Sequence, residues 1–270
     1  MKRARKSPAD KKSTEEFKSR ELKSLEEERT RDLKRFEEER RREDVKKLKK
    51  KLQEMFESST KQPVNKKGKN QKDENNYSDN EDKEAIDHLD FSLHRVSDAG
   101  VEAILEYAIP NLQHLILVEN EITGDGAKLL GENSNWPNLT ELMLSFNKIG
   151  DEGATALAKN DSWKYLTELN LCGNNIGVEG ATALAKNIFW VNLKKLDLSE
   201  NEIGVEGVAA LIKNNTWVKL AKLYLASNNL GAEGAAMLAE NSSWTKLREL
   251  NLEDNNIGKE GAKGLAKNNS

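Results

Sequence analysis

Apolar and polar positions follow two different patterns along the chain. From residue 85 onwards, leucine recurs every 27 residues between Leu112 and Leu247, and each recurrence opens an LxxLxL segment. Such alternation of apolar and polar positions is typical of a strand with one buried face. In residues 14–56, by contrast, a sparse apolar stripe runs through a segment that is mostly charged. The pattern therefore divides the chain into a repetitive part and a charged part.

A helix is expected in the second half of each repeated unit. The segment GxEGAxALAKN spaces its apolar residues three and four positions apart, as does a helix with one buried face. One strand and one helix cannot bury their own apolar faces, but stacked copies can. A weaker copy begins at Ile86 and a shortened one at Leu247, so seven copies occupy residues 85–270. The pattern predicts an α/β solenoid with a parallel sheet inside and helices outside.

The repeat resembles a known family. LxxLxLxxN followed by IGxEGAxAL is similar to the leucine-rich repeat, and in particular to its ribonuclease-inhibitor-like class. This resemblance implies a leucine-rich-repeat solenoid whose parallel sheet forms the concave face. It also implies that one asparagine of each unit hydrogen-bonds the backbone of neighbouring turns. These residues are Asn120, Asn147, Asn174, Asn201, Asn228 and Asn255.

Tryptophan also recurs at one position of the unit, as Trp136, Trp163, Trp190, Trp217 and Trp244. Each follows a predicted helix, where we expect it to wedge between the helix end and the next strand. Residues that keep the repeat period serve the stack, so these side chains are assigned to the core. For the last unit two alternatives stay open: either the helix of residues 259–267 closes the stack, or that end contacts another molecule.

The charged part is expected to form one long helix. Residues 14–56 contain neither glycine nor proline, and pairs such as Glu27 and Arg31 stand one helical turn apart in the favourable order. The apolar stripe is thin, so the segment is interpreted as a solvated single helix or a weak coiled coil that self-associates. Residues 1–13 are expected to be a disordered basic tail, and the polar residues 57–84 a flexible linker.

Charge changes sign along the chain. Residues 1–56 carry 21 basic and 14 acidic side chains, whereas residues 85–270 carry 16 basic and 25 acidic ones. The acidic repeat part favours a protein partner with basic patches. Acidic residues are interleaved with the lysines of the first part, which argues against nucleic acid as a partner.

Composition excludes several classes of protein. A single cysteine, Cys172, excludes a disulfide framework and a thiolate zinc cluster. Neither a secretory signal peptide nor an apolar run long enough to span a membrane is found. We therefore expect an intracellular protein, cytoplasmic first, with the nucleus or delivery into a host cell as alternatives.

No catalytic constellation is found in the sequence. It contains no phosphate-binding loop, no GxSxG segment and no HExxH segment, so we expect no catalytic residue and no cofactor. The histidines are His88, His94 and His114, and a metal site at the first two repeats would need Asp90 as its third ligand. No metal site is predicted. Cys172 has no aligned histidine that could activate it as a nucleophile.

The remaining candidate for a binding site is the concave face, because the side chains next to the strand leucines point toward it. Ile116, Val118 and Met143 are apolar at positions where the repeat needs nothing apolar, and Phe146 flanks them. Tyr224 provides a second aromatic contact. The predicted partner-binding residues are His114, Ile116, Val118, Met143, Phe146, Asn170, Asp197, Tyr224 and Asn251.

The sequence therefore predicts a non-enzymatic module that binds a protein on the concave face of the solenoid. Two alternatives remain. One is a self-assembling scaffold, joined through the N-terminal helix and the last repeat. The other is a regulator of a small GTPase or of another enzyme, which rests on analogy with other leucine-rich-repeat proteins.

Overall fold

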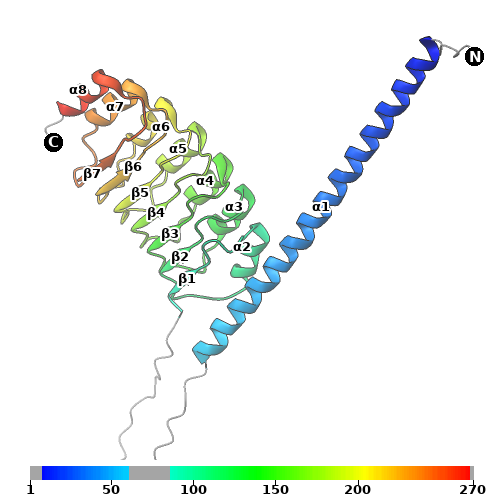
Figure 1. Ribbon diagram of the computed structural model, residues 1–270. Coiled ribbons are helices and arrows are strands. Elements are labelled where there is room, and N and C mark those ends of the chain that lie inside the picture. The colour runs from blue at the N-terminus through cyan, green and yellow to red at the C-terminus, as the bar shows by residue number, and fades with distance from the viewer. Residues whose placement is uncertain (1–7, 61–85, 268–270) are drawn as a thin grey trace, which may run out of the picture. The chain divides into compact units, whose positions relative to one another are not determined.

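The computed structural model describes residues 8–60 and 86–267. Its sheet contains seven parallel strands in sequence order, β1 to β7, and a helix follows each strand (Figure 1). The strands are β1 (His88–Asp90), β2 (His114–Ile116), β3 (Glu141–Met143), β4 (Glu168–Asn170), β5 (Lys195–Asp197), β6 (Lys222–Tyr224) and β7 (Glu249–Asn251).

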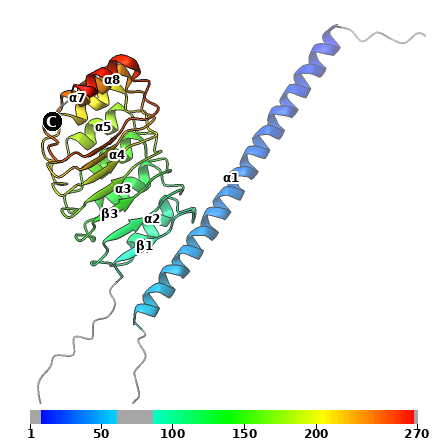
Figure 2. The same cartoon turned by 60° about the vertical axis from the view of Figure 1, so that its left-hand side comes forward.

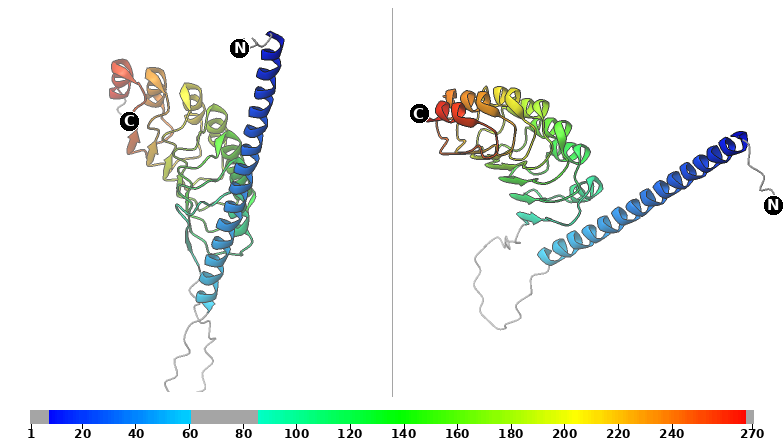
Figure 3. Two further views of the ribbon diagram at one scale, coloured as in Figure 1. Left: turned by 45° about the vertical axis from the view of Figure 1, so that its right-hand side comes forward. Right: turned by 45° about the horizontal axis from the view of Figure 1, so that its top comes forward.

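Helices alternate with the strands and form a second layer on the outside of the sheet (Figure 2 and Figure 3). They are α2 (Asp98–Leu105), α3 (Gly124–Glu132), α4 (Gly150–Ala158), α5 (Val178–Ala185), α6 (Gly204–Leu211), α7 (Gly231–Glu240) and α8 (Gly258–Ala266). The α/β solenoid predicted from the repeat is therefore confirmed for the described residues.

The core lies between the two layers. Every strand places its central leucine inward, and parallel pairing aligns these leucines, as in Leu142 with Leu169 and Leu169 with Leu196. From β1 to β6 these central side chains are completely buried. Burying a leucine side chain contributes roughly 1.5–3 kcal/mol, so each added unit stabilises its neighbours.

The asparagine ladder implied by the resemblance is confirmed. Asn147 shows the pattern: its Nδ2 donates to the carbonyl of Leu117 at 2.9 Å, and its Oδ1 accepts from the Ile122 amide at 3.0 Å. Equivalent bonds recur from Asn120 to Asn255. The ladder matters because a buried backbone group without a partner costs about 1–3 kcal/mol.

The tryptophans are buried as expected, and a second asparagine row that the sequence analysis missed holds them. Trp163 is fully buried, and its amide donates to Oδ1 of Asn160. The Nδ2 of Asn160 donates to the Asn133 carbonyl of the preceding unit at 2.8 Å. Asn187, Asn214 and Asn241 repeat the bond to the tryptophan amide. These asparagines therefore shape each turn before a strand.

Helix α1 spans Pro8–Thr60, which is longer than the segment 14–56 expected from the sequence. Of the predicted tail 1–13 and linker 57–84, only residues 8–13 and 57–60 are described, and they belong to α1; the rest of both segments lies outside the described residues. The chain forms two compact units, Met1–Asp44 and Val45–Ser270, so the last turns of α1 belong to the unit that contains the repeats.

These last turns cover the first repeat. Leu48 and Leu52 are buried in the same core as the strand leucines. The Phe56 ring stacks on Tyr107 with 4.7 Å between ring centroids, and the ammonium of Lys49 lies 2.8 Å from Glu106 Oε1. Leu48, Leu52 and Met55 stand four and three residues apart, on one helical face. The end of the helix therefore caps the repeat core.

Candidate interaction surface

The first and third residues of each strand face the concave side, because the central leucine points into the core. Parallel register aligns these residues in two rows. The first row is His88, His114, Glu141, Glu168, Lys195, Lys222 and Glu249. The second row is Asp90, Ile116, Met143, Asn170, Asp197, Tyr224 and Asn251.

The structure places the predicted apolar residues on β2 and β3 or just after these strands. Ile116 pairs with Met143 in register, and both are half-buried, as is Val118. Phe146 follows β3 with a left-handed backbone (φ 56°), and its side chain is 44% exposed. A Cβ on Gly173 would lie 2.7 Å from the Phe146 ring, so the ring lies directly over that glycine. We call Ile116, Val118, Met143 and Phe146 the apolar patch.

Charged side chains of β4 to β7 pair with one another across neighbouring strands. Lys195 forms an ion pair with Glu168, and Lys222 Nζ lies 2.8 Å from Glu249 Oε2. The Tyr224 hydroxyl donates to Glu249 Oε1 at 2.6 Å, and the Lys195 ammonium lies 5.7 Å from the Tyr224 ring centroid. This half of the face therefore satisfies its charges internally.

The pKa values follow these contacts. Hydrogen bonds from Lys222 and Tyr224 lower the pKa of Glu249, while the bond to Glu249 raises the pKa of Tyr224 and of Lys222. Burial is the largest influence on Lys195 and by itself would lower its pKa, but the hydrogen bond to Glu168 and the attraction of Glu168, Tyr224 and Asp197 together raise the pKa. All four groups therefore keep their ordinary charge at neutral pH.

Three predicted binding residues also have a bond within the repeat. In each case the side-chain Oδ1 accepts a hydrogen bond from the backbone amide two residues later. The distances are 3.0 Å for Asn170, 3.0 Å for Asp197 and 2.9 Å for Asn251. Asp90 does the same with Ser92. Short polar side chains favour this local turn, and their shared repeat position is the signal that could have indicated it.

Tyr224, three strands from Met143, is about 14 Å away at the usual strand spacing.

The histidines and the cysteine of this face have few partners of the kind that metal binding or catalysis needs. The His88 and His114 rings lie 5.6 Å apart, but no group of three potential metal ligands occurs in residues 8–60 and 86–267. Asp90 bonds Ser92 instead. Cys172 is buried, and this burial raises the pKa of its thiol to about 12, so it stays protonated at neutral pH.

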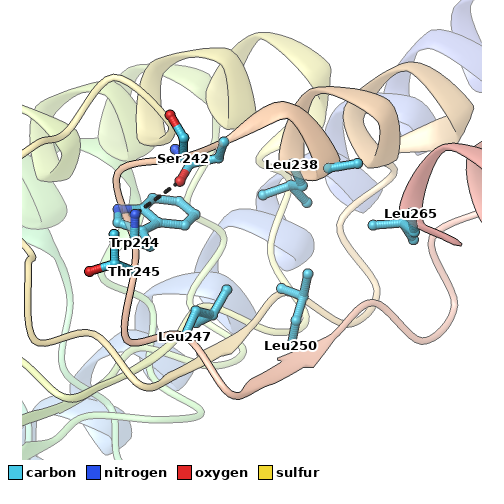
Figure 4. A pocket seen from close by; sticks show the side chains of 9 residues that line it. Leu238, Ser242, Trp244, Thr245, Leu247, Leu250 and Leu265 are labelled. Atoms are coloured by element: carbon cyan, nitrogen blue, oxygen red, sulfur yellow. Dashed lines mark hydrogen bonds between the residues drawn. The ribbon is translucent and has the colours of Figure 1, made fainter. Parts of the chain in front are cut away.

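The last described repeat contains a cavity of about 350 Å³ between α7, β7 and α8 (Figure 4). Trp244, Leu247, Leu250 and Leu265 line it together with Leu238. Leu247 and Leu250 are only half-buried, whereas the equivalent leucines of the preceding units are completely buried. The apolar side of this unit is therefore partly uncovered.

Comparison with known families identifies the fold. The leucine-rich repeat family model matches seven segments, at 86–105, 108–131, 137–158, 164–185, 191–211, 218–239 and 245–266. Together they cover more than half of the chain, so the chain belongs to the leucine-rich repeat family. The ribonuclease-inhibitor-like class is compatible with this match and stays a prediction. The family supports a role in protein interaction.

Among solved structures, the chain is similar to "Leiomodin-1 Actin-Binding Site 2 (ABS2)". The match has 20% sequence identity and a TM-score of 0.39, and it covers 53% of this chain and 88% of that chain. No significant match was found among curated proteins. Within residues 8–60 and 86–267, no helix combines the length and apolar character needed to cross a membrane.

Proposed function

We propose that this protein is a non-enzymatic interaction module that binds a protein partner on the concave face of its solenoid, with the apolar patch as the main contact. The observation that supports this is the difference between the two halves of the face. Apolar side chains gather over β2 and β3, whereas charges over β4 to β7 already pair with each other. Burying apolar surface contributes about 25 cal/mol per Å², while desolvating a satisfied ion pair costs energy.

The partner we propose presents an apolar side chain flanked by basic groups. Glu141 lies in register with His114 beside the patch, and exposed Glu119 follows Val118. The repeat part as a whole carries more acidic than basic side chains. Charge complementarity of this kind speeds association and selects among partners. Tyr224 is a second contact for the same partner, since the strand spacing leaves it within reach of one helix lying across the sheet.

Affinity capture with the full chain tests this proposal. The variant Met143→Arg with Phe146→Asp places charges in the apolar patch, and aspartate tolerates the left-handed backbone at position 146. A control away from the concave face is Glu233→Arg with Lys263→Asp, because both side chains are exposed on the outer helices α7 and α8. Like the patch variant, this control places one arginine and one aspartate on the surface and leaves the net charge unchanged.

We expect a specific protein to be retained by the parent chain and the control and lost from the patch variant, with unchanged circular dichroism for all three. Mass spectrometry identifies the retained protein. Equal retention of every captured protein by the patch variant would contradict binding at this patch.

Self-association through α1 is a second candidate, because Leu33 and Phe36 are exposed on its surface, Leu33 to 55%. These two side chains stand three residues apart, which places them on one helical face. Light scattering at several concentrations tests the idea. We expect the mass to rise with concentration and to fall back to that of a monomer in Leu33→Lys with Phe36→Lys; a parent chain that stays monomeric throughout refutes it.

A further inference from the structure

Exposed apolar side chains concentrate on one edge of the solenoid. Of the seven large apolar side chains that are highly exposed within residues 86–267, five lie on the segments that lead from a helix to the next strand. They are Tyr165, Ile188, Phe189, Val191 and Val218. They belong to three consecutive connections, 159–167, 186–194 and 213–221, which contain six lysines and which we call the basic edge.

The three connections touch one another. The Nδ2 of Asn192 donates to the Lys164 carbonyl at 2.7 Å, and the Lys219 ammonium donates to Oδ1 of Asn192 at 2.7 Å. Val191 and Val218 occupy equivalent positions of successive repeats, and Ile188 lies three residues before Val191. The five side chains therefore stand on adjacent loops rather than being scattered over the surface.

The repeat does not require apolar residues at these positions. Asp161, Asn215 and Ser242 are the equivalents of Ile188, which is 60% exposed. Ser162 and Thr216 are equivalents of Phe189, and their hydroxyls bond Oδ1 of the preceding asparagine at 2.8 and 3.1 Å. Phe189 has no hydroxyl group and therefore cannot form this side-chain hydrogen bond. A side chain that departs from its own repeat and stays exposed is better explained by contact with another molecule than by folding.

Lysines surround these apolar side chains. The basic edge contains Lys159, Lys164, Lys186, Lys194, Lys213 and Lys219, and its acidic side chain is Asp161. Lys159, Lys186 and Lys213 follow helix ends, where a cation also stabilises the helix dipole. Lys164, Lys194 and Lys219 lie beyond the helices, so the dipole does not explain them.

The opposite edge has the reverse charge. The segments that lead from a strand to the next helix carry six acidic side chains, Glu119, Glu121, Glu200, Glu202, Glu253 and Asp254, against two basic ones, Arg95 and Lys148. The basic edge is therefore a local exception on a repeat part that is acidic as a whole. Charges separated in this way orient an approaching charged molecule and select its sign.

We propose that the basic edge binds an acidic polypeptide segment whose apolar side chains pack against Ile188, Phe189 and Val191. This surface is separate from the concave face and would allow the protein to hold two partners at once. The apolar contacts supply affinity, whereas the lysines select acidic flanks and speed association. Two of the five apolar residues are valines, whose short side chains suit close packing with another side chain better than insertion into a lipid layer.

Selection from a displayed library of random peptides tests the chemistry of this surface. The full chain is the target, and bound peptides are counter-screened on two variants. Ile188→Ser with Val191→Ser removes apolar contacts at positions where sister repeats carry polar residues. Lys164→Glu with Lys194→Glu reverses two charges that lie outside the helices. Met143→Arg with Phe146→Asp, on the concave face, is the control.

We expect the peptides lost from the first variant to combine Asp or Glu with aromatic or aliphatic residues. Their binding, measured by fluorescence anisotropy of a synthetic copy, should weaken about tenfold in either basic-edge variant and stay unchanged in the control. It should also weaken as salt is raised, because the lysines are exposed.

Several results would overturn the proposal. Peptides that depend on the basic edge but carry no excess of acidic residues would contradict the charge argument, and the absence of any such peptide would contradict the surface itself. Binding of anionic vesicles or of RNA that the same variants abolish, without peptide binding, would assign the edge to a lipid or nucleic-acid partner. A mass increase lost in Ile188→Ser with Val191→Ser would assign it to a second copy.

Discussion

The first and the last described repeats share the same strand and helix but differ in what covers the apolar side that has no neighbouring repeat. The first repeat is covered by the end of α1, where Leu52 is 0% exposed and Phe56 stacks on Tyr107. In the last described repeat, Leu247 and Leu250 are half-buried and line a cavity. The difference shows that the repeat sequence does not supply its own cover: at the first repeat, residues from outside the repeats provide it.

The comparison also distinguishes two uses of a helix. In the unit Met1–Asp44, α1 exposes Leu33 and Phe36, whereas in the unit from Val45 onwards the same helix buries Leu48 and Leu52. A single continuous helix therefore exposes apolar side chains along one stretch and buries them as a structural cap along another. Its sequence pattern is similar in both stretches, and what differs is whether a surface is present to bury the apolar side chains.

The largest effect is expected from Leu52→Ala. Removing a fully buried leucine side chain costs about 2–5 kcal/mol, because transfer energy is lost and a cavity remains. The matched control is Leu33→Ala on the exposed part of the helix, where the change should stay within about 0.5 kcal/mol. Urea unfolding followed by circular dichroism measures both. Equal stability of the two variants would contradict the capping role of the helix end.

A smaller effect is expected from Leu250→Ala in the last described repeat. Leu169 is its equivalent in β4 and is completely buried, so Leu169→Ala should cost about 2–5 kcal/mol. Leu250 already borders a cavity and is half-buried, so its truncation removes fewer contacts and should cost roughly half as much. The same unfolding experiment compares the pair. A cost for Leu250→Ala that equals that for Leu169→Ala would show that the last repeat is packed as tightly as the interior.

The sequence predicts the frame of the solenoid well because the frame is periodic. The strand leucines, the asparagine ladder and the buried tryptophans recur in phase, and the structure confirms all three. The pairing of Glu168 with Lys195 could also have been found, since residues 27 apart are neighbours in register. Each of these features depends on a spacing between residues that recurs in several repeats.

Features that occur once are harder to predict. Leu48 and Leu52 show helical spacing, but no sequence pattern predicts that they pack against the first repeat. Asn170 and Asp197 are predicted as binding residues because they stand beside strand leucines and so face the concave side, a criterion that does not reveal their role in a local turn. No periodic pattern marks the exposed residues of the basic edge, since Ile188 and Phe189 each stand at a position that is polar in the sister repeats.

The smallest effect is expected from Lys49→Met, which breaks the ion pair with Glu106 but keeps the aliphatic part of the side chain. The hydrogen bond to Glu106 raises the pKa of Lys49 above its ordinary value of 10.5. A raised folded-state pKa means that the pair stabilises the fold below about pH 10.5 and stops doing so as the pH rises through the folded value. Both side chains are exposed, so solvent screens the pair.

Thermal unfolding of Lys49→Met should therefore differ least from that of the parent among these variants, and the difference should vanish in alkaline solution or at high salt. Lys50→Met is its control, because Lys50 is exposed and pairs with Glu54 within the helix itself at 3.7 Å. If Lys49→Met were as destabilising as Leu52→Ala, the cap would be held mainly by charge. A small change would instead assign the attachment of the helix end to its buried apolar side chains.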